Sequence, residues 1–155
     1  MIIREATRLV DCFNVLPFVR GLDSFYPDIT EWFVNKAIPG IVVGSDICLI
    51  AEDGNNVCGV VLAKNTIAEK KLRCVRVVPS YVGRGLGYKL IERAIYKLGN
   101  ETPIASVAEE KINDYSRLLV NGFGFKLTGV EKGVYRRGKL EYVFNGADIR
   151  SKTSY

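Results

Sequence analysis

The spacing of apolar residues divides the first half of the chain into helices followed by strands. Residues 5–21 and 28–38 carry helical patterns, the second opened by Pro27-Asp28 and stopped by Pro39-Gly40. Short apolar runs then predict three strands, at residues 47–51, 57–64 and 72–78. An Asp-Gly-Asn-Asn turn joins the first two. We therefore expect two helices and then three antiparallel strands.

In the second half the apolar period changes to that of a helix. Residues 86–98 form an amphipathic pattern that Gly99-Asn100 stops. A short strand, a second amphipathic helix and a hairpin follow, at residues 104–107, 112–122, 126–135 and 140–145. This order predicts an α/β fold with helices on both faces of a mixed, mostly antiparallel sheet. We expect a single domain over residues 1–146, followed by a polar tail, residues 147–155, that frays.

Composition adds little to this expectation. The 155 residues are 48% hydrophobic and 25% charged, the balance of an ordinary globular domain. Charge close to the start argues against a signal peptide, and no apolar run approaches the ~20 residues that span a bilayer. We therefore expect a cytoplasmic protein with no membrane partner. The net charge of +5 either attracts a polyanionic partner or reflects a mildly basic surface.

The residue types present restrict the possible chemistry. The chain has no histidine, which excludes mechanisms built on a Ser-His or Cys-His pair. Its four cysteines, Cys12, Cys48, Cys58 and Cys74, are widely spaced and form no C-x-x-C pair, so we expect no metal site. A catalyst made from this chain must use carboxylates, tyrosines, a thiol, backbone amides or water.

The stretch Val77 to Leu90, VVPSYVGRGLGYKL, carries the strongest chemical signal. A strand ends at a proline, a glycine-dense loop follows, and an amphipathic helix begins at once. Glycines let a ligand approach the backbone, and the N–H groups of residues 83–88 at a helix start favour a phosphate, with Arg84 adding charge. A dinucleotide-binding fingerprint would need glycine in place of Tyr88, and a P-loop would need Gly-Lys-Ser/Thr, so both are rejected.

This loop resembles the coenzyme A loop of the GNAT superfamily of N-acyltransferases, [QR]-x-x-G-x-[GA]. The matching residues are Val82-Gly83-Arg84-Gly85-Leu86-Gly87, with Val82 in place of Gln or Arg. A second GNAT pattern, N-x-x-A-x-x-L-Y-x-x-x-G-F, is matched at Asn113, Ser116, Leu119, Val120, Gly124 and Phe125. Val120 replaces the tyrosine that often protonates the departing thiolate. The resemblance covers residues 45–145.

The resemblance implies direct transfer of an acetyl group from acetyl-CoA to a primary amine. It also implies that the amide of Val77 or Val78 contacts the thioester oxygen and that Asn113 lies beside the pantetheine arm. The residues it implies for coenzyme A binding are Val77, Val78, Val82, Gly83, Arg84, Gly85, Leu86, Gly87, Tyr88, Asn113 and Ser116.

Acyl transfer to an aliphatic amine requires that the amine lose a proton before it attacks. The candidate bases are Glu109 and Glu110, directly after the 104–107 strand, with Glu52 and Asp53 as alternatives. Each is equally explained as a solvated surface acid. The candidate acid is Tyr115, with Tyr81, Tyr88 and solvent as alternatives.

Two further groups of residues have both a structural and a functional reading. Arg73 and Arg76 differ in parity on the 72–78 strand, so we expect them on opposite faces of the sheet, one of them near the cofactor or acceptor cleft. The aromatic residues Phe25, Tyr26, Trp32 and Phe33 either wall the acceptor site or pack the core.

Three functions follow from the resemblance. The first is acetylation of a protein or peptide amine, the second acetylation of a small amine or of aminoacyl-tRNA, and the third acyl-CoA binding without turnover. The replacements at Val82 and Val120 motivate the third. The final hairpin, with Tyr135, Tyr142 and Phe144, offers an edge for a homodimer.

Overall fold

The computed structural model describes residues 1–146, which form one seven-stranded sheet in the order β1-β2-β3-β4-β5-β7-β6. The strands are β1 (Ile2–Glu5), β2 (Asp46–Asp53), β3 (Asn56–Asn65), β4 (Lys70–Val77), β5 (Ile104–Ala108), β6 (Leu127–Lys132) and β7 (Leu140–Phe144). Every neighbouring pair is antiparallel except β4 and β5, which run parallel. The expected mixed, mostly antiparallel sheet is confirmed. The predicted fraying tail, residues 147–155, lies outside the described residues.

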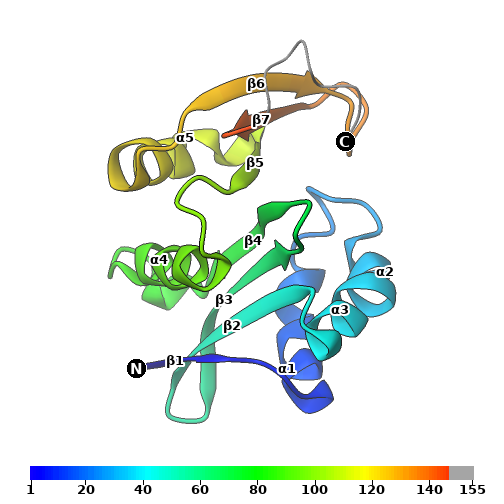
Figure 1. Ribbon diagram of the computed structural model, residues 1–155, viewed down its shortest axis with the longest axis vertical. Coiled ribbons are helices and arrows are strands. Elements are labelled where there is room, and N and C mark those ends of the chain that lie inside the picture. The colour runs from blue at the N-terminus through cyan, green and yellow to red at the C-terminus, as the bar shows by residue number, and fades with distance from the viewer. Residues whose placement is uncertain (147–155) are drawn as a thin grey trace.

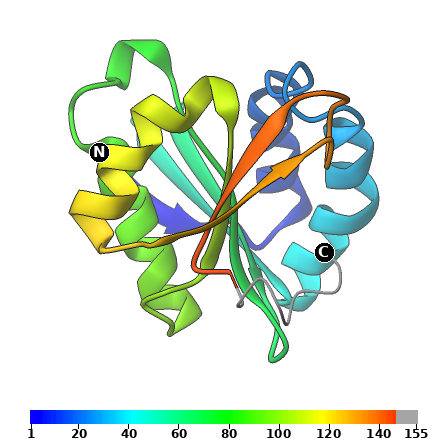
Figure 2. The ribbon, with the colours of Figure 1, turned by 90° about the horizontal axis from the view of Figure 1, so that it is seen from above.

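Helices cover both faces of the sheet (Figures 1 and 2). One face carries α1 (Leu9–Arg20), α2 (Ile29–Trp32), the π-helix η1 (Phe33–Ala37) and α3 (Ile38–Val43). The other carries α4 (Leu86–Leu98), α5 (Ile112–Ser116) and the π-helix η4 (Arg117–Gly122). Two single 3₁₀ turns, η2 (Pro79–Tyr81) and η3 (Glu109–Lys111), follow β4 and β5.

Alternation along the central strands supplies both cores. Val61 of β3 packs with Leu90 and Ile91 of α4 in one buried cluster, whereas its neighbour Val60 packs with Val15 of α1 in the other. Because successive strand residues point to opposite faces, a strand buried on both sides reads as a continuous apolar run. The structure confirms the helix over residues 86–98, which α4 matches at both ends.

Two predictions for the first 45 residues are wrong. The helix predicted from residue 5 begins only at Leu9, and residues 2–5 form an edge strand that was not predicted, in which each residue pairs with β2 and Arg4 donates to Glu52 and to the buried Asp11. Pro39 does not stop the second helix, which continues to Val43 and ends at Gly44 in the left-handed region. The preceding turn is a π turn, in which Ile38 bonds to the carbonyl five residues earlier, and this wider turn accommodates the proline.

The parallel pair β4 and β5 is joined over only two residues. Lys71 pairs with Ile104 and Leu72 with Ala105, and beyond them the two strands diverge (Figure 1). Within residues 1–146, the edge of β4 from Arg73 to Val77 therefore has no strand partner on the β5 side. Backbone N–H and C=O groups left along such an edge are hydrogen-bonding sites for another extended molecule.

Candidate active site

The glycine-dense loop forms a backbone cradle at the start of α4. Gly83 and Gly85 have φ of 85° and 77°, in the left-handed region that favours glycine. Gly85 is the N-cap residue of α4, and no side chain of the described residues caps that helix. A Cβ atom added at Gly83 or Gly85 would meet nothing within 4 Å. The start of α4 therefore lacks a side-chain cap among the described residues and has space beside two of its glycines, as an anion site requires.

Aromatic contacts hold the cradle and its cation in place. The hydroxyl of Tyr81 donates to Asp53 in the β2–β3 turn, and this bond is the main reason why the pKa of Tyr81 is raised. The guanidinium of Arg84 lies 5.2 Å from the centre of the Tyr81 ring. Arg84 is therefore held beside the loop by which we expect phosphates to bind. Val82, at the position of the missing Gln or Arg, is 66% exposed.

The second motif lies against the first. Tyr88, in the first turn of α4, stacks on Phe123 with ring centres 4.6 Å apart, and a Cβ atom at Gly122 would lie 3.4 Å from the Tyr88 ring. The start of α4 and the end of η4 therefore touch. Asn113 is exposed and Ser116 is half-buried on α5. Val120 is 42% exposed, so the residue that replaces the usual tyrosine is not part of the core.

The hydrogen bonds of β4 distinguish the backbone amide of Val77 from that of Val78, the two candidates for contact with the thioester oxygen. The amide of Val78 donates to the carbonyl of Cys58 at 2.9 Å, on the β3 side. Since backbone groups alternate between the two edges of a strand, those of Val77 and Val75 face the β5 side. Of the two amides predicted to contact the thioester oxygen, that of Val77 therefore faces the gap between the diverging strands β4 and β5, which we call the β4–β5 opening.

Tyr115 reaches this opening from α5. Its hydroxyl donates to the carbonyl oxygen of Val75 at 2.9 Å, across the gap where β5 would otherwise pair. Burial raises the pKa of Tyr115 to about 12, so the hydroxyl keeps its proton at neutral pH. Tyr115 can therefore donate a proton or a hydrogen bond at the α4–α5 side of the opening.

The predicted bases are all engaged with other groups. Glu109 accepts the backbone N–H of Leu140 at 2.7 Å. Glu110 forms two hydrogen bonds with Arg136, at 2.6 and 2.7 Å, which lower the pKa of Glu110 to about 2. A carboxylate with so low a pKa has little affinity for a proton, which disfavours Glu110 as a base. The alternatives Glu52 and Asp53 bind Arg4 and Tyr81.

Arg73 and Arg76 lie on the same face, so the prediction of opposite faces is wrong. Arg73 lies 5.2 Å from the centre of the Trp32 ring, and the guanidinium of Arg76 packs against Gly21 at the end of α1. The register of β3 and β4 shifts between Cys74 and Leu72, which makes Arg73 an extra residue. Such a bulge changes the side-chain parity that follows it. The Nε of Arg73 is buried and has no hydrogen-bond partner among the described residues.

The four aromatic residues divide between core and site. Phe33 is fully buried in the core. Phe25 and Tyr26, in the α1–α2 connection, contact the opposite end of the chain: Phe25 lies 5.6 Å from the guanidinium of Arg136, and the Tyr26 ring packs edge-on against Tyr135 at 5.1 Å. Aromatic side chains thus line the α1–α2 side of the β4–β5 opening.

One residue in this region was missed by sequence reasoning. Glu141 of β7 is only 5% exposed, and the hydroxyl of Tyr26 donates to its Oε1 at 2.8 Å. The signal was an acidic residue at an alternate position of the apolar run Leu140–Phe144. In such a strand every second residue faces the same side, and here Glu141 shares its side with buried Val143.

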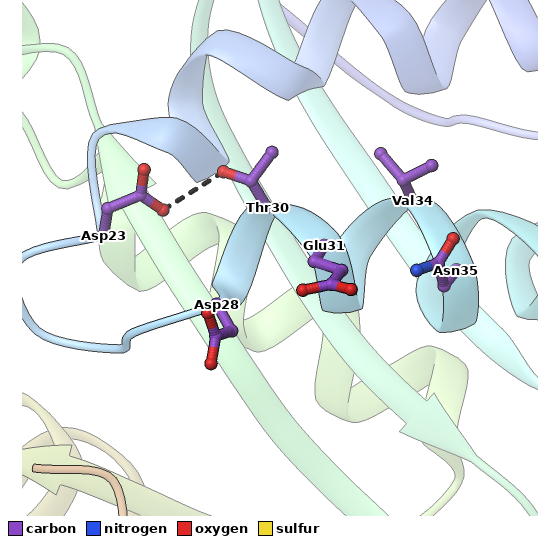
Figure 3. A pocket seen from close by; sticks show the side chains of 6 residues that line it. All are labelled: Asp23, Asp28, Thr30, Glu31, Val34 and Asn35. Atoms are coloured by element: carbon purple, nitrogen blue, oxygen red, sulfur yellow. Dashed lines mark hydrogen bonds between the residues drawn. The ribbon is translucent and has the colours of Figure 1, made fainter.

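A separate groove of about 650 Å³ runs along the side of α2 turned away from the sheet (Figure 3). Its lining residues are Asp23, Asp28, Thr30, Glu31, Val34 and Asn35. Thr30 donates to Asp23 at 3.1 Å. The three carboxylates give this groove a negative potential. Within residues 1–146, no three metal-ligating side chains gather to hold an ion, and no helix is long and apolar enough to cross a membrane.

Known proteins share this fold. The alignment with an acetyltransferase of the GNAT family from Bacillus cereus covers 92% of this chain and 94% of that protein, at 19% identity and a TM-score of 0.67. The alignment with the ribosomal-protein-S18-alanine N-acetyltransferase from Escherichia coli covers 92% of each chain, at 15% identity and a TM-score of 0.71. The alignment with an aminoglycoside 6′-N-acetyltransferase complexed with coenzyme A covers 93% of this chain and 95% of that protein, at 16% identity and a TM-score of 0.65.

These identities are low enough that the three structures show the fold alone. No curated protein matches the chain in sequence. The sequence profile of the Acetyltransferase (GNAT) family, however, matches residues 8–125, which include the cradle, the unpaired edge of β4 and all of α5 and η4. The chain therefore belongs to the GNAT family of acetyltransferases.

Proposed function

We propose that the protein transfers an acetyl group from acetyl-CoA directly to a primary amine of a protein or peptide. The observation that carries this proposal is the presence of two neighbouring open hydrogen-bonding surfaces, one at the start of α4 and one along the edge of β4. The uncapped start of α4 suits the phosphates of coenzyme A, and the unpaired edge of β4 suits the amide groups of its pantetheine arm. The contact between Tyr88 and Phe123 joins the two motifs.

The chain's own groups supply positioning and electrostatics in this reaction. With the arm along β4, the amide of Val77 donates to the thioester oxygen and stabilises the negative charge that develops there. Tyr115, held beside Val75 by a 2.9 Å hydrogen bond, gives a proton to the departing thiolate. Holding the amine and the thioester together contributes much of the rate in such direct transfers.

The protein or peptide acceptor is favoured by one neighbour and one surface. The ribosomal-protein-S18-alanine N-acetyltransferase, which shares the fold, is named for a protein acceptor. The three carboxylates of the groove along α2 suit a basic segment of such an acceptor. A small cationic amine is the second candidate, because the same groove attracts it and the aminoglycoside enzyme shares the fold. The +5 charge favours aminoacyl-tRNA as a third.

The donor half of the proposal is tested by isothermal titration of acetyl-CoA into the wild type, Gly85→Glu and Gly85→Ala. At 4–5 Å from a phosphate, the new carboxylate costs about 1–4 kcal/mol, or a ~10- to 1000-fold loss of affinity. Alanine imposes the same left-handed strain without the charge, and its Cβ meets nothing. We expect it to change affinity less than about threefold, with a stability cost of ~1–2 kcal/mol.

The outcomes of this titration differ for each function. Equal affinity for all three proteins, or no binding by the wild type, contradicts the cradle assignment. Binding without turnover of basic peptides, polyamines or charged tRNA favours an acyl-CoA-binding module, which the replacements at Val82 and Val120 motivate. Acetylation of basic peptides ahead of acidic ones supports the proposed acceptor, whereas a steep loss of activity with salt on charged tRNA alone points to the third candidate.

A further inference from the structure

Glu141 is a buried carboxylate without an ionic partner. Of the charged residues in the described chain, only Asp11 and Glu141 are buried. Asp11 is paired with Arg4 at 2.9 Å, whereas no cation in the described chain lies within 4.0 Å of Glu141. Its side-chain hydrogen-bond partner in the described chain is a neutral phenol, that of Tyr26. A buried charge without a counter-ion is costly, which makes a functional reason for keeping it the first to consider.

The Tyr26–Glu141 bond crosses the opening between β4 and β5. Glu141 pairs with Ala108, the last residue of β5. Ala108 lies three residues beyond Ala105, which pairs with Leu72, so Glu141 is level with the β4 residues three to four beyond Leu72, Val75 and Arg76. The bond joins the α1–α2 connection to β7, 115 residues apart in the sequence.

Two tyrosines bracket the same stretch of β4 from opposite faces. Tyr115 belongs to the cluster around α4 and donates to Val75, whereas Tyr26 belongs to the cluster around α1. Cys74, next to Val75, packs against the same cluster as Tyr26. A thioester held along this edge therefore has Tyr115 on one side and the Tyr26–Glu141 pair on the other.

From this arrangement we propose that Glu141 accepts the proton of the acceptor ammonium, on the α1–α2 side of the β4–β5 opening, with Tyr26 as its positioning residue. The assignment rests on the proposed amine acetylation. It gives the chain a base that does not depend on Glu109 or Glu110, both of which are tied to the β6–β7 segment.

The proton and electron balance of the step is simple. The ammonium gives one proton to the Glu141 carboxylate, and the lone pair of the free amine forms the C–N bond at the thioester carbonyl. The C–S bond then breaks, and the second proton of the nitrogen is balanced by protonation of the thiolate, giving the free thiol. Glu141 returns its proton to solvent, so the sum is amide, thiol and one proton.

The charges around Glu141 suit this role. Burial raises the pKa of Glu141 above that of an ordinary carboxyl, and Glu110 raises it further. The hydrogen bond from Tyr26 and the positive charges of Arg136 and Lys71 lower it, which limits the rise. A raised pKa brings a carboxylate closer to the proton affinity that general base catalysis needs near neutral pH. Two further titratable side chains lie beside it: Glu131, which pairs with Glu141 across β6 and β7, and Tyr135. Tyr135 stays neutral because burial raises its pKa as well.

A cavity beside Glu141 gives the proton a route out. It has a volume of about 20 Å³ and is lined by Glu141, Lys71, Ser106 and Tyr135, among others. A space of this size has room for about one water molecule, and its lining offers that water several polar partners.

The test compares two small amines of similar size as acceptors for acetyl-CoA: propylamine, protonated at pH 7, and methoxyamine, which is not. Glu141→Gln keeps an oxygen for the Tyr26 hydroxyl but removes the base. We expect it to lower kcat/KM for propylamine by about 10²- to 10³-fold, and for methoxyamine by less than about threefold. Glu92→Gln, on the exposed side of α4, is the matched control and changes neither.

The pH profile separates a base from a structural residue. For propylamine, the acidic limb of the wild-type profile disappears in Glu141→Gln. In Tyr26→Phe it moves to higher pH, because the lost hydrogen bond no longer lowers the pKa of Glu141. Equal losses on both amines, or an acidic limb unchanged in both variants, would overturn the assignment.

Titration with acetyl-CoA and thermal unfolding of every variant keep the two proposals distinguishable. Unchanged acetyl-CoA binding shows that a variant is folded and that its donor site is intact. If the wild type fails to bind acetyl-CoA, the proposed function fails, and the base assignment fails with it. If it binds acetyl-CoA but accelerates neither amine above the buffer rate, donor binding stands and the base assignment is overturned.

Discussion

Replacing Glu141 with glutamine is expected to make the protein more stable at neutral pH, although it removes the proposed base. Burial disfavours the charged form of Glu141, so its pKa in the folded state lies above the 4.5 of the free side chain. The folded protein therefore binds this proton more tightly than the unfolded chain does. By linkage, the wild type is penalised above the folded-state pKa and relieved of the penalty as the pH falls towards about 4.5.

The size of the effect follows from the surroundings of Glu141. Glu141 is 5% exposed and has no ion pair with any described residue, but it keeps one hydrogen bond at 2.8 Å, which glutamine can also accept. Replacing a buried, unpaired charge by a neutral group of the same shape stabilises by about 1–2 kcal/mol, towards the low end of the range for buried charges because the hydrogen bond is retained. For a chain of this size that corresponds to a rise in Tm of about 3–6 °C.

Thermal unfolding of both proteins between pH 4 and 8 measures this effect directly. The difference in stability should be near zero at about pH 4.5, grow as the pH rises and then level off. Carboxylates such as Asp11 titrate in both proteins and cancel in the difference. A glutamine variant that is less stable than the wild type at pH 7, or a difference that does not change with pH, would refute the reasoning.

Two further substitutions test the supports of the site. Gly59→Ala places a Cβ atom 2.9 Å from Leu90 Cδ1, under the first turns of α4. We therefore expect the free energy of unfolding to fall by about 1–3 kcal/mol in chemical denaturation, and acetyl-CoA to bind more weakly in titration. An unchanged unfolding midpoint would contradict this packing. Tyr115→Phe should lower kcat by about 10²-fold for propylamine and methoxyamine alike, because the departing thiolate is the same in both reactions. Steady-state assays that show a loss for propylamine alone would contradict the role of Tyr115 as the acid.

The local structure of the proposed donor half was predictable from the sequence because it is contiguous. The cradle lies within one stretch between a strand and a helix, and α4 has the predicted ends because its apolar residues repeat at helical spacing over 13 residues. A glycine at the start of a helix allows a left-handed backbone conformation, and this effect does not depend on tertiary contacts. The same locality explains why a short strand such as β1 was missed, since four residues are too few to show a period.

The acceptor half was not predictable because long-range contacts decide it. The bulge that turns Arg73 onto the face of Arg76 depends on the pairing of β3 with β4, not on the sequence of β4 alone. The contact of Tyr26 with Glu141 spans 115 residues. Neither residue has a neighbour in sequence that marks it, and an acidic residue in an apolar run reads equally well as the exposed side of an edge strand.

In the proposed complex, the divergence of β4 from β5 places the donor and the acceptor on opposite faces of the sheet. An extended donor arm along the β4 edge replaces the missing strand, so its thioester lies in the plane of the sheet. The α4 side of that plane is then occupied by the phosphate cradle and by Tyr115. In this arrangement the amine approaches the thioester from the other side, where Tyr26 of the α1–α2 connection contacts Glu141 of β7. A base for that amine must therefore come from those elements, and the buried carboxylate that they hold at this level is Glu141.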